Sequence, residues 1–423
     1  GIYNPLVLDL IDLNQKGNRN WVPIGNDLEK WGDSNRLTRP LESMSNDKTD
    51  NSEVSVIENL TWLANPSIYS DLSLNMILYS SHSSEKPWYA SSDISALSKE
   101  GGGDWTIEPV TDDQSAEFTP QLAKVLDDTL MASWTRVHGD VSNAQGPEEI
   151  VPHLEIIAAF YDMPSKSWTG LERLTDNLLT DRKPLPVSFG AHTGVIWIQN
   201  EGIEMVGSPS SGDRLMYCEY TGSGWGTPVI IWDSQTGIID FTYTSDNGGE
   251  CYVTVAVDQD GNLDDSDDQE LYLVSTTGGT WQSGQRLTDD NIQDHLPVLV
   301  SPDNSPMLVW RSGSTLKYTY INDFNPQSVF SEQTISGKAP SLSGIDFPGG
   351  AAIAYSKQQE DGIDLFAAYF DTTLNVWSMP RRLTDDGSAE NAVALSFDSE
   401  KLVFTYLKTM TIHEDISTVL NQE

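Results

Sequence analysis

Short runs of apolar and β-branched residues recur along the whole chain, separated by turns rich in Gly, Pro, Asn and Asp. Examples are PVLVS from Pro297, LKYTYI from Leu316 and LEIIAAFYD from Leu154. Runs of this length and composition predict β-strands. Amphipathic windows with helical spacing are nearly absent, and the best of them, QLAKVLDDTL from Gln121, also fits a strand and a turn. The pattern predicts an all-β protein.

A tryptophan followed by Arg-Leu-Thr-Asp recurs at intervals of about 45 to 75 residues. After each Leu-Thr-Asp turn come three apolar runs, the first often preceded by a proline, and the next tryptophan begins a fourth run. The clear copies begin at Trp31, Trp168, Trp281 and Trp377, weaker ones at Trp105 and Trp225, and a degenerate one at Phe330.

Seven copies of a four-stranded unit predict a seven-bladed β-propeller of four-stranded antiparallel blades, because one blade alone cannot bury both of its faces. We expect a single domain over residues 1–423, with the ring closed by a blade that residues 1–39 and 391–423 share. In the alternative, His413 to Leu420 completes that blade and Pro5 to Leu13 lies outside; we favour the shared blade. The other blades are expected at residues 51–112, 118–176, 183–232, 237–289, 295–336 and 339–385.

One segment carries a family resemblance. RLTDDNIQDHLPVLVSPDNSPMLVW, from Arg286 to Trp310, resembles the propeller repeat of TolB-type and related bacterial and archaeal surface proteins. That repeat has Leu-Thr, then Pro, then Ser-Pro-Asp-Gly before an apolar strand; here Asn304 replaces the glycine, and only this unit keeps Ser-Pro-Asp. The resemblance implies a propeller architecture and a binding or scaffolding role.

The charge narrows the choice of partners. The chain has 63 Asp and Glu against 24 Lys and Arg, a formal net charge of −39. Nucleic acids and anionic membranes attract cationic surfaces, so neither is expected as a partner. No apolar run is long enough to insert directly into a membrane. Because the chain starts at Gly1 without Met, we expect it to be a processed or excised part of a larger polypeptide or surface assembly.

Two cysteines, Cys218 and Cys251, form either one disulfide or two buried thiols. We favour thiols because both cysteines lie in apolar, strand-like runs. Cysteine usage therefore leaves the cellular compartment open.

The loops after the second strands are long in four units, at Ser80, His138, Gln199 and Asp258, and short after Arg311 and Lys357. In a propeller these loops emerge on the same face as the Leu-Thr-Asp turns. One side of one face is therefore built up, and elaborated loops on a rigid scaffold commonly carry binding sites.

The Asp258 to Glu270 loop, DQDGNLDDSDDQE, is the sharpest chemical signal. Oxygen-bearing side chains at alternate positions, namely Asp258, Asp260, Asn262 and Asp264, can turn inward around Ca²⁺, which takes six to eight oxygen ligands. It is not an EF-hand loop, because Leu263 and Gln269 stand where that loop needs Gly and Glu. The alternative is a solvated acidic hairpin loop; we favour Ca²⁺.

The repeated Thr and Asp of the Leu-Thr-Asp turn predict a latch between blades, and the repeated Trp predicts packing between blades. Four residues at the ends of second strands are candidates to face a ligand, although an Arg in so acidic a protein is more often an ion-pair partner. These candidates are His82, Arg136, His138 and Arg311.

Enzyme signatures are missing. The sequence lacks the Ser-x-Asp-x-Gly-x-x-Trp boxes of sialidases, a G-x-S-x-G elbow, an H-E-x-x-H motif and a phosphate-binding loop. We therefore expect an extracellular or cell-surface propeller, stabilised by Ca²⁺, that binds a protein or a glycan through its loop-rich face. Two alternatives stay open: a carbohydrate-active hydrolase or lyase on the same scaffold, and a structural subunit of a surface assembly.

Overall fold

In the computed structural model, the described residues are 2–3, 6–12, 55–57, 65–82, 86–101, 103–144, 149–202, 204–263, 265–330, 335, 341–360, 362–385, 389–399 and 401–411. The Trp31 copy of the repeat, Asp264, the side chain of His82 and the segment 413–420 lie outside this part of the chain.

Five sheets each consist of four or five consecutive antiparallel strands in simple up-and-down order. The first sheet contains β4 (Ser67–Ser70), β5 (Leu74–His82), β6 (Ser92–Glu100) and β7 (Thr106–Pro109). The second contains β8 (Glu117–Leu126), β9 (Thr129–Val137), β10 (Leu154–Asp162) and β11 (Ser167–Arg173). The third contains β12 (Thr180–Phe189), β13 (His192–Asn200), β14 (Asp213–Glu219) and β15 (Val229–Asp233).

The next two sheets follow the same order. The fourth contains β16 (Gly237–Ser245), β17 (Cys251–Asp258), β18 (Gln269–Thr277), β19 (Thr280–Trp281) and β20 (Gln285–Arg286). The fifth contains β21 (Asp294–Val300), β22 (Met307–Ser312), β23 (Thr315–Tyr320) and β24 (Asp323–Ser328). Three short 3₁₀ turns lie in connections: η5 (Trp88–Ala90), η7 (Val151–His153) and η8 (Pro302–Asn304).

The sixth sheet has ten strands and combines two groups. One group contains β25 (Leu342–Phe347), β26 (Gly350–Gln358), β27 (Ile363–Asp371), β28 (Val376–Trp377) and β29 (Arg381–Arg382). The other contains β30 (Ala389–Phe397), β31 (Lys401–Thr411), β1 (Ile2–Tyr3), β2 (Leu6–Asp12) and β3 (Ser55–Ile57). A single parallel residue pair, Ile363 with Ala389, joins the groups.

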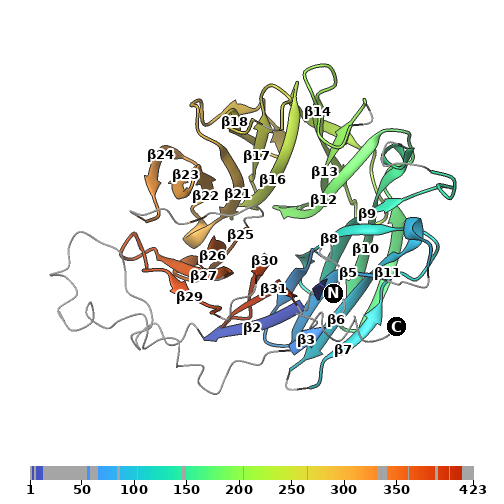
Figure 1. Cartoon of the computed structure of the whole chain (residues 1–423), viewed down its shortest axis with the longest axis horizontal. Helices are drawn as coiled ribbons and strands as arrows, with labels where there is room; N and C mark the ends of the chain where they lie inside the picture. Colours follow the sequence, from blue (N-terminus) through green and yellow to red (C-terminus); the bar gives the residue numbers. More distant parts are fainter. Residues whose placement is uncertain are drawn as a thin grey trace, which may run out of the picture.

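The sheets are arranged around a common centre, with first strands such as β12 and β21 nearest the middle (Figure 1). The fold is thus a β-propeller of four-stranded antiparallel sheets, which confirms the predicted class. The N-terminal strand β2 pairs with β31, Leu6 lying opposite Leu407. The number of seven blades and the closing of the ring stay predictions, because residues 13–39 and 412–423 of the proposed shared blade lie outside the described residues.

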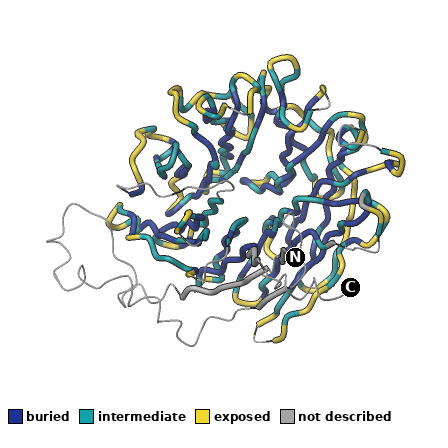
Figure 2. The backbone as a smooth tube through the Cα atoms, in the orientation of Figure 1, coloured by how far each residue is buried: buried dark blue, intermediate teal, exposed yellow. Residues whose placement is uncertain are grey.

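The hydrophobic core lies between neighbouring sheets. Trp134 of β9 packs in a cluster with Leu78 of β5, while Ile156 of β10 packs in another cluster with Trp197 of β13. The second sheet therefore has an apolar interface on both faces, and buried residues concentrate in the inner and middle strands while loops are exposed (Figure 2). The first strand of the second sheet, β8, contains the first part of the segment QLAKVLDDTL from Gln121, and a turn follows it. This segment is therefore a strand and a turn, not a helix.

The first strands carry a recurring irregularity. In five of them the pairing register with the second strand shifts near the same position, as a β-bulge does. At four of these bulges a residue other than glycine has a positive φ: Thr119 (52°), Lys183 (54°), Leu296 (50°) and Ala392 (50°). Bulges re-aim side chains along a strand, so this irregularity sets which inner-strand residues turn toward the middle of the propeller.

The repeated tryptophans pack across sheet boundaries, as predicted. Trp281 of the fourth sheet lies 5.7 Å from Tyr217 of the third, ring centre to ring centre. Trp377 of the sixth lies 5.9 Å from Tyr318 of the fifth. Cys218 and Cys251 are both buried free thiols, the favoured of the two sequence alternatives. Among the described residues no helix is long and apolar enough to cross a membrane.

Candidate functional site

The Leu-Thr-Asp turn is a latch between sheets, as the sequence predicted. In four units the Thr hydroxyl accepts a hydrogen bond of 2.9 Å from a backbone amide of the third strand in its own sheet. Thr384 also donates to Glu390 of β30 (2.8 Å), and Thr111 donates to Glu117 of β8, the first strand of the next sheet. The amide–hydroxyl pairs are Ile94 with Thr111, Ile156 with Thr175, Leu271 with Thr288 and Leu365 with Thr384.

Buried carboxylates complete each latch. The indole N–H donates to an acid of the adjacent first strand in three sheets: Trp134 to Glu117 (2.9 Å), Trp197 to Asp181 (2.7 Å) and Trp310 to Asp294 (2.9 Å). Burial raises the pKa of all three acids, that of Glu117 to about 7. An arrangement that recurs from sheet to sheet serves the fold, so none of these acids is a candidate for chemistry.

The fourth sheet departs from this pattern. The register pairs Gly237 with Asp258, where the corresponding pairs elsewhere are Glu117 with Arg136 and Asp294 with Ser312. Glycine therefore replaces the latch acid. A Cβ on Gly237 would lie 2.5 Å from the carbonyl oxygen of Gly207, so a larger residue does not fit there.

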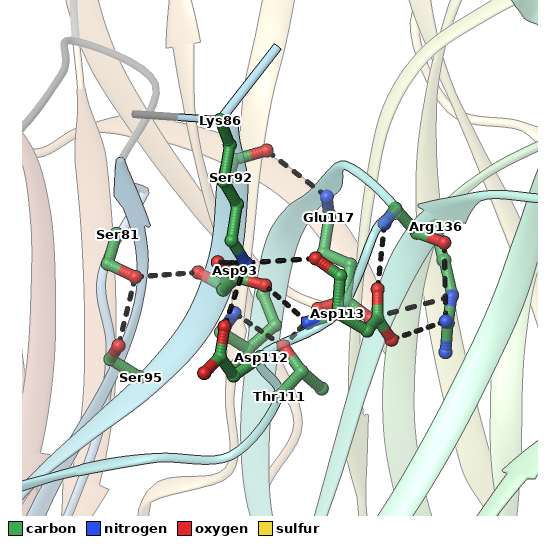
Figure 3. A network of polar contacts seen from close by, with 12 residues as sticks. Ser81, Lys86, Ser92, Asp93, Ser95, Thr111, Asp112, Asp113, Glu117 and Arg136 are labelled. Atoms are coloured by element: carbon green, nitrogen blue, oxygen red, sulfur yellow. Dashed lines mark hydrogen bonds and ion pairs between the residues drawn. The ribbon is translucent and has the colours of Figure 1, made fainter. Parts of the chain in front are cut away.

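Arg136, a predicted ligand-facing residue, is an ion-pair partner instead. Its guanidinium pairs with Asp113 and lies 3.8 Å from Glu117. Nearby, Lys86 binds Asp93 (2.7 Å) and Asp112 (2.9 Å). Figure 3 shows both cations turned into this group of acids. Their charge is thus used for ion pairs inside the protein, which was the expected alternative to ligand binding.

The structure offers less support for a ligand-binding role of the two histidine candidates, His138 and His82. His138 is exposed in the loop between β9 and β10, and its backbone amide donates to the carbonyl of His153 (2.8 Å). Partial burial and the nearby Arg173 and Arg136 lower its pKa. The side chain of His82 lies outside the described residues.

Arg311 differs from Arg136. It lies on β22, its Nε donates to the carbonyl of Gly313 (2.6 Å), and it has no carboxylate partner among the described residues. Partial burial lowers its pKa. In a protein of net charge −39, a guanidinium without an acidic partner is unusual.

His295 lies directly opposite Arg311, on β21. The residue is 8% exposed, and Nδ1 is buried with no hydrogen-bond partner in the part of the chain that the structure describes. Burial and, to a smaller extent, the charge of Arg311 lower the pKa of His295 to about 4, while Asp240 acts in the opposite direction. The imidazole is therefore neutral at physiological pH.

Two more residues of the first strands complete an inner-strand cluster, which we define as Lys183, Asp240, His295 and Arg311. Lys183 of β12 forms an ion pair with Asp240 of β16, which interacts electrostatically with His295 of β21. Lys183 stands on a bulge, and His295 directly precedes the bulge residue Leu296. Three consecutive sheets thus bring ionisable groups together, and first strands such as β12 and β21 lie near the middle of the propeller (Figure 1). Sequence reasoning found Arg311 and missed the other three, because bulge positions carry no recognisable pattern.

A second group of acids lies in the loop between β17 and β18. Asp258, Asp260 and Asp268 each offer an oxygen within 4.8 Å of the others, an arrangement that could hold a metal ion. Asp258 and Asp260 were predicted, whereas Asp268 was not. The backbone amide of Asn262 donates to Asp260 (2.7 Å), and the predicted role of the Asn262 side chain as a ligand stays a prediction.

No family model matches the chain, and no curated protein matches it either. Solved structures give distant likenesses. A sialidase of Trypanosoma rangeli, in complex with the inhibitor DANA, is 10% identical, with 86% of this chain and 57% of that one covered and a TM-score of 0.44. This chain thus spans little more than half the length of that sialidase.

Two other solved structures match this chain over a larger share of their own length. A polysaccharide lyase of family PL25, an ulvan lyase, is 12% identical, with 85% of this chain and 96% of that one covered and a TM-score of 0.49. The NanB sialidase of Streptococcus pneumoniae is 10% identical, with 85% and 75% covered and a TM-score of 0.40. Likenesses at this identity concern the propeller fold alone, and the TolB-type family stays an expectation.

Proposed function

We propose that this propeller binds a glycan that bears carboxylate groups, and that the inner-strand cluster contacts one such carboxylate. The observation that carries the proposal is Arg311, whose guanidinium has no carboxylate partner among the described residues although the chain has 63 acidic residues. A planar guanidinium offers paired N–H donors that match a carboxylate. An anionic ligand would supply the partner that the described part of the protein does not.

The net charge favours a glycan over denser polyanions. A surface of −39 repels nucleic acid, which carries a charge on every nucleotide. A glycan with a carboxylate on some of its sugars has a lower charge density. Its neutral hydroxyl groups can donate hydrogen bonds to acidic oxygens of the site, such as those of Asp240. An extracellular or cell-surface location would suit such a ligand and belongs to the same proposal.

The affinity for acidic oligosaccharides tests this proposal. We would titrate a panel of oligosaccharides bearing uronate or sialate groups, each beside its carboxyl-reduced form, by calorimetry. Binding should require the carboxylate, and Arg311→Gln should weaken it by about tenfold or more, since a charge-assisted bond is worth roughly 1.5 to 3 kcal/mol.

Arg214→Gln is the matched control, because Arg214 is a partly exposed arginine already paired with Glu201. It should bind as the unchanged protein does. Equal affinity of Arg311→Gln and Arg214→Gln, or equal binding of the carboxyl-reduced sugars, would overturn the proposal.

A second candidate function is cleavage of the bound glycan, as a lyase. The observation that favours it is His295, a neutral imidazole that lies opposite Arg311 and interacts electrostatically with Arg311 and Asp240. A neutral imidazole can accept a proton from the carbon next to a uronate carboxylate, whose developing charge Arg311 would stabilise. The C4–O bond then breaks, a C4=C5 double bond forms, and solvent protonates the leaving oxygen. Ultraviolet absorbance of the unsaturated product, lost in His295→Gln, is the expected result; binding without such product would leave a binding module.

A further inference from the structure

The loop between β17 and β18 brings three carboxylates to one place. Asp258 ends β17 and pairs with Gln269 at the start of β18, so the two ends of the loop are adjacent. Asp260 follows at one end and Asp268 precedes β18 at the other. One oxygen of each carboxylate lies within 4.8 Å of the others. The β17–β18 hairpin, labelled in Figure 1, therefore sets this convergence.

Backbone amides occupy one oxygen of each carboxylate. Gly261 donates to Oδ1 of Asp258 (2.6 Å), Asn262 donates to Oδ1 of Asp260 (2.7 Å), and Asp260 donates to Oδ2 of Asp268 (2.9 Å). Gly261 has a φ of +80°, which favours glycine at this turn. The loop therefore fixes the three side chains in place.

Two of the remaining carboxylate oxygens are buried without a hydrogen-bond donor among the described residues. Asp258 is fully buried, yet its Oδ2 has no hydrogen-bond partner among the described residues, and Oδ1 of Asp268 is likewise buried without one there. A buried carboxylate oxygen left unpartnered is costly, and like charges at this separation repel. No Lys or Arg among the described residues forms an ion pair with any of the three. A bound cation would meet all of these requirements at once.

We propose that Asp258, Asp260 and Asp268 bind a Ca²⁺ ion. All the available side-chain ligands are oxygens, which hard cations prefer, and the group contains no His or Cys to favour zinc. Ca²⁺ accepts irregular sets of six to eight ligands, so waters and backbone carbonyls can complete the shell in a partly exposed loop. Mg²⁺ demands a near-regular octahedron and keeps more of its water.

The ion would also hold the loop against its neighbour. A Cβ on Gly261 would lie 2.8 Å from Cδ of Pro209, in the long loop between β13 and β14 of the third sheet. The turn that presents Asp258 to the ion is thus the turn that touches the adjacent loop. Ca²⁺ binding should stabilise this contact between two of the elaborated loops.

Calorimetric titration of the chelator-treated full chain with CaCl₂ tests the site, together with thermal melting in CaCl₂ or EGTA. The experiments contain 0.5 M NaCl, a concentration at which general attraction of cations to an acidic protein is screened to within about 3 to 5 Å. We expect saturable binding and a higher melting temperature in CaCl₂ than in EGTA. Asp260→Asn and Asp268→Asn should each weaken Ca²⁺ binding by about tenfold or more, because affinity depends on the charge of the ligands.

Asp267→Asn is the matched control, since it removes the same charge from the same loop but lies outside the group. It should keep the calcium response. The proposal fails if Asp260→Asn and Asp268→Asn respond like Asp267→Asn, or if MgCl₂ at equal ionic strength raises the melting temperature as much as CaCl₂. Neither readout involves a glycan, so the result is independent of the proposed function.

Discussion

A single hydrogen bond distinguishes otherwise similar tryptophans. Trp134 is fully buried and donates to Oε1 of the buried Glu117. Trp377 is 2% exposed, but its indole nitrogen has no hydrogen-bond partner among the residues that the structure describes. The two side chains therefore differ in the bond and hardly in burial, which allows the bond to be measured by itself.

Replacing Trp134 by Phe should lower the free energy of unfolding by about 1 to 3 kcal/mol more than replacing Trp377 by Phe. Both changes shorten an aromatic ring system, but only Trp134→Phe leaves a buried carboxylate oxygen without its donor. Chemical denaturation of both variants gives the comparison. Equal losses would show that the indole bond to Glu117 contributes nothing to stability.

At the residue scale, the sequence showed which residues could take part in a site, but not which other residues each of them contacts. The Asp258 loop stands out by composition, and two of its three converging acids were named. Asp268 was missed because the pairing of Asp258 with Gln269 is needed to see that the loop ends meet. Arg136 and Arg311 occupy similar places at the ends of second strands, but Arg136 contacts Asp113 and Glu117, whereas Arg311 has no carboxylate partner in the described part of the chain.

At the scale of elements, the turns between sheets contribute hydrogen bonds that join neighbouring groups of strands. Thr384 follows β29, accepts a hydrogen bond from Leu365 of β27 and donates one to Glu390 of β30. One hydroxyl group thus fixes a turn to its own sheet and to the next group of strands.

Thr384→Val should therefore destabilise the protein by about 1 to 3 kcal/mol, since it keeps the shape of the side chain while removing a donor and an acceptor from a buried site. Thr384→Ser keeps the hydroxyl and should cost less than half as much. Thermal melting of the two variants checks this expectation. A Val variant as stable as the Ser variant would mean that the latch is not held by the hydroxyl.

The repeat made the strands and the latch predictable, because the Leu-Thr-Asp turn and the tryptophan combine distinctive residues at fixed spacing. The bulges at Thr119, Lys183 and Leu296 were not predictable, since those residue types share no local preference for positive φ. Lys183 and His295 owe their positions in the inner-strand cluster to these bulges, so most of that cluster was invisible in the sequence.

For the whole molecule, the acids act in two ways. About half of the acidic side chains that the structure describes are exposed, and in a chain of net charge −39 they repel one another. Others are buried in the latches, where burial raises the pKa of Glu117, Asp181 and Asp294. Both effects disfavour the folded protein as these groups lose their protons.

Stability should accordingly be greater at pH 5 than at pH 8. The pKa of Glu117 rises from 4.5 to about 7 on folding, so its stabilising protonation is complete below pH 4.5 and lost as the pH rises through 7. That rise corresponds to roughly 3 kcal/mol. Glu117→Gln should flatten the dependence of melting temperature on pH, whereas the exposed control Glu360→Gln should not.

Melting temperatures measured between pH 5 and 8, at low and high NaCl, give the comparison. Salt should stabilise the protein more at pH 8 than at pH 5, because more surface carboxylates are charged there. A melting temperature that rises from pH 5 to pH 8 would contradict this account.

Gly237 has a consequence for how such a protein can diversify. In the second, third and fifth sheets, the acid that meets the tryptophan is committed to holding the ring together. In the fourth sheet a glycine takes that place, and the carboxylate opposite it, Asp258, has no structural duty of that kind. A repeated architecture can thus gain a new property when one repeat no longer needs the acid that bonds to the tryptophan. That repeat, here the fourth sheet, is where a new ligand is best sought.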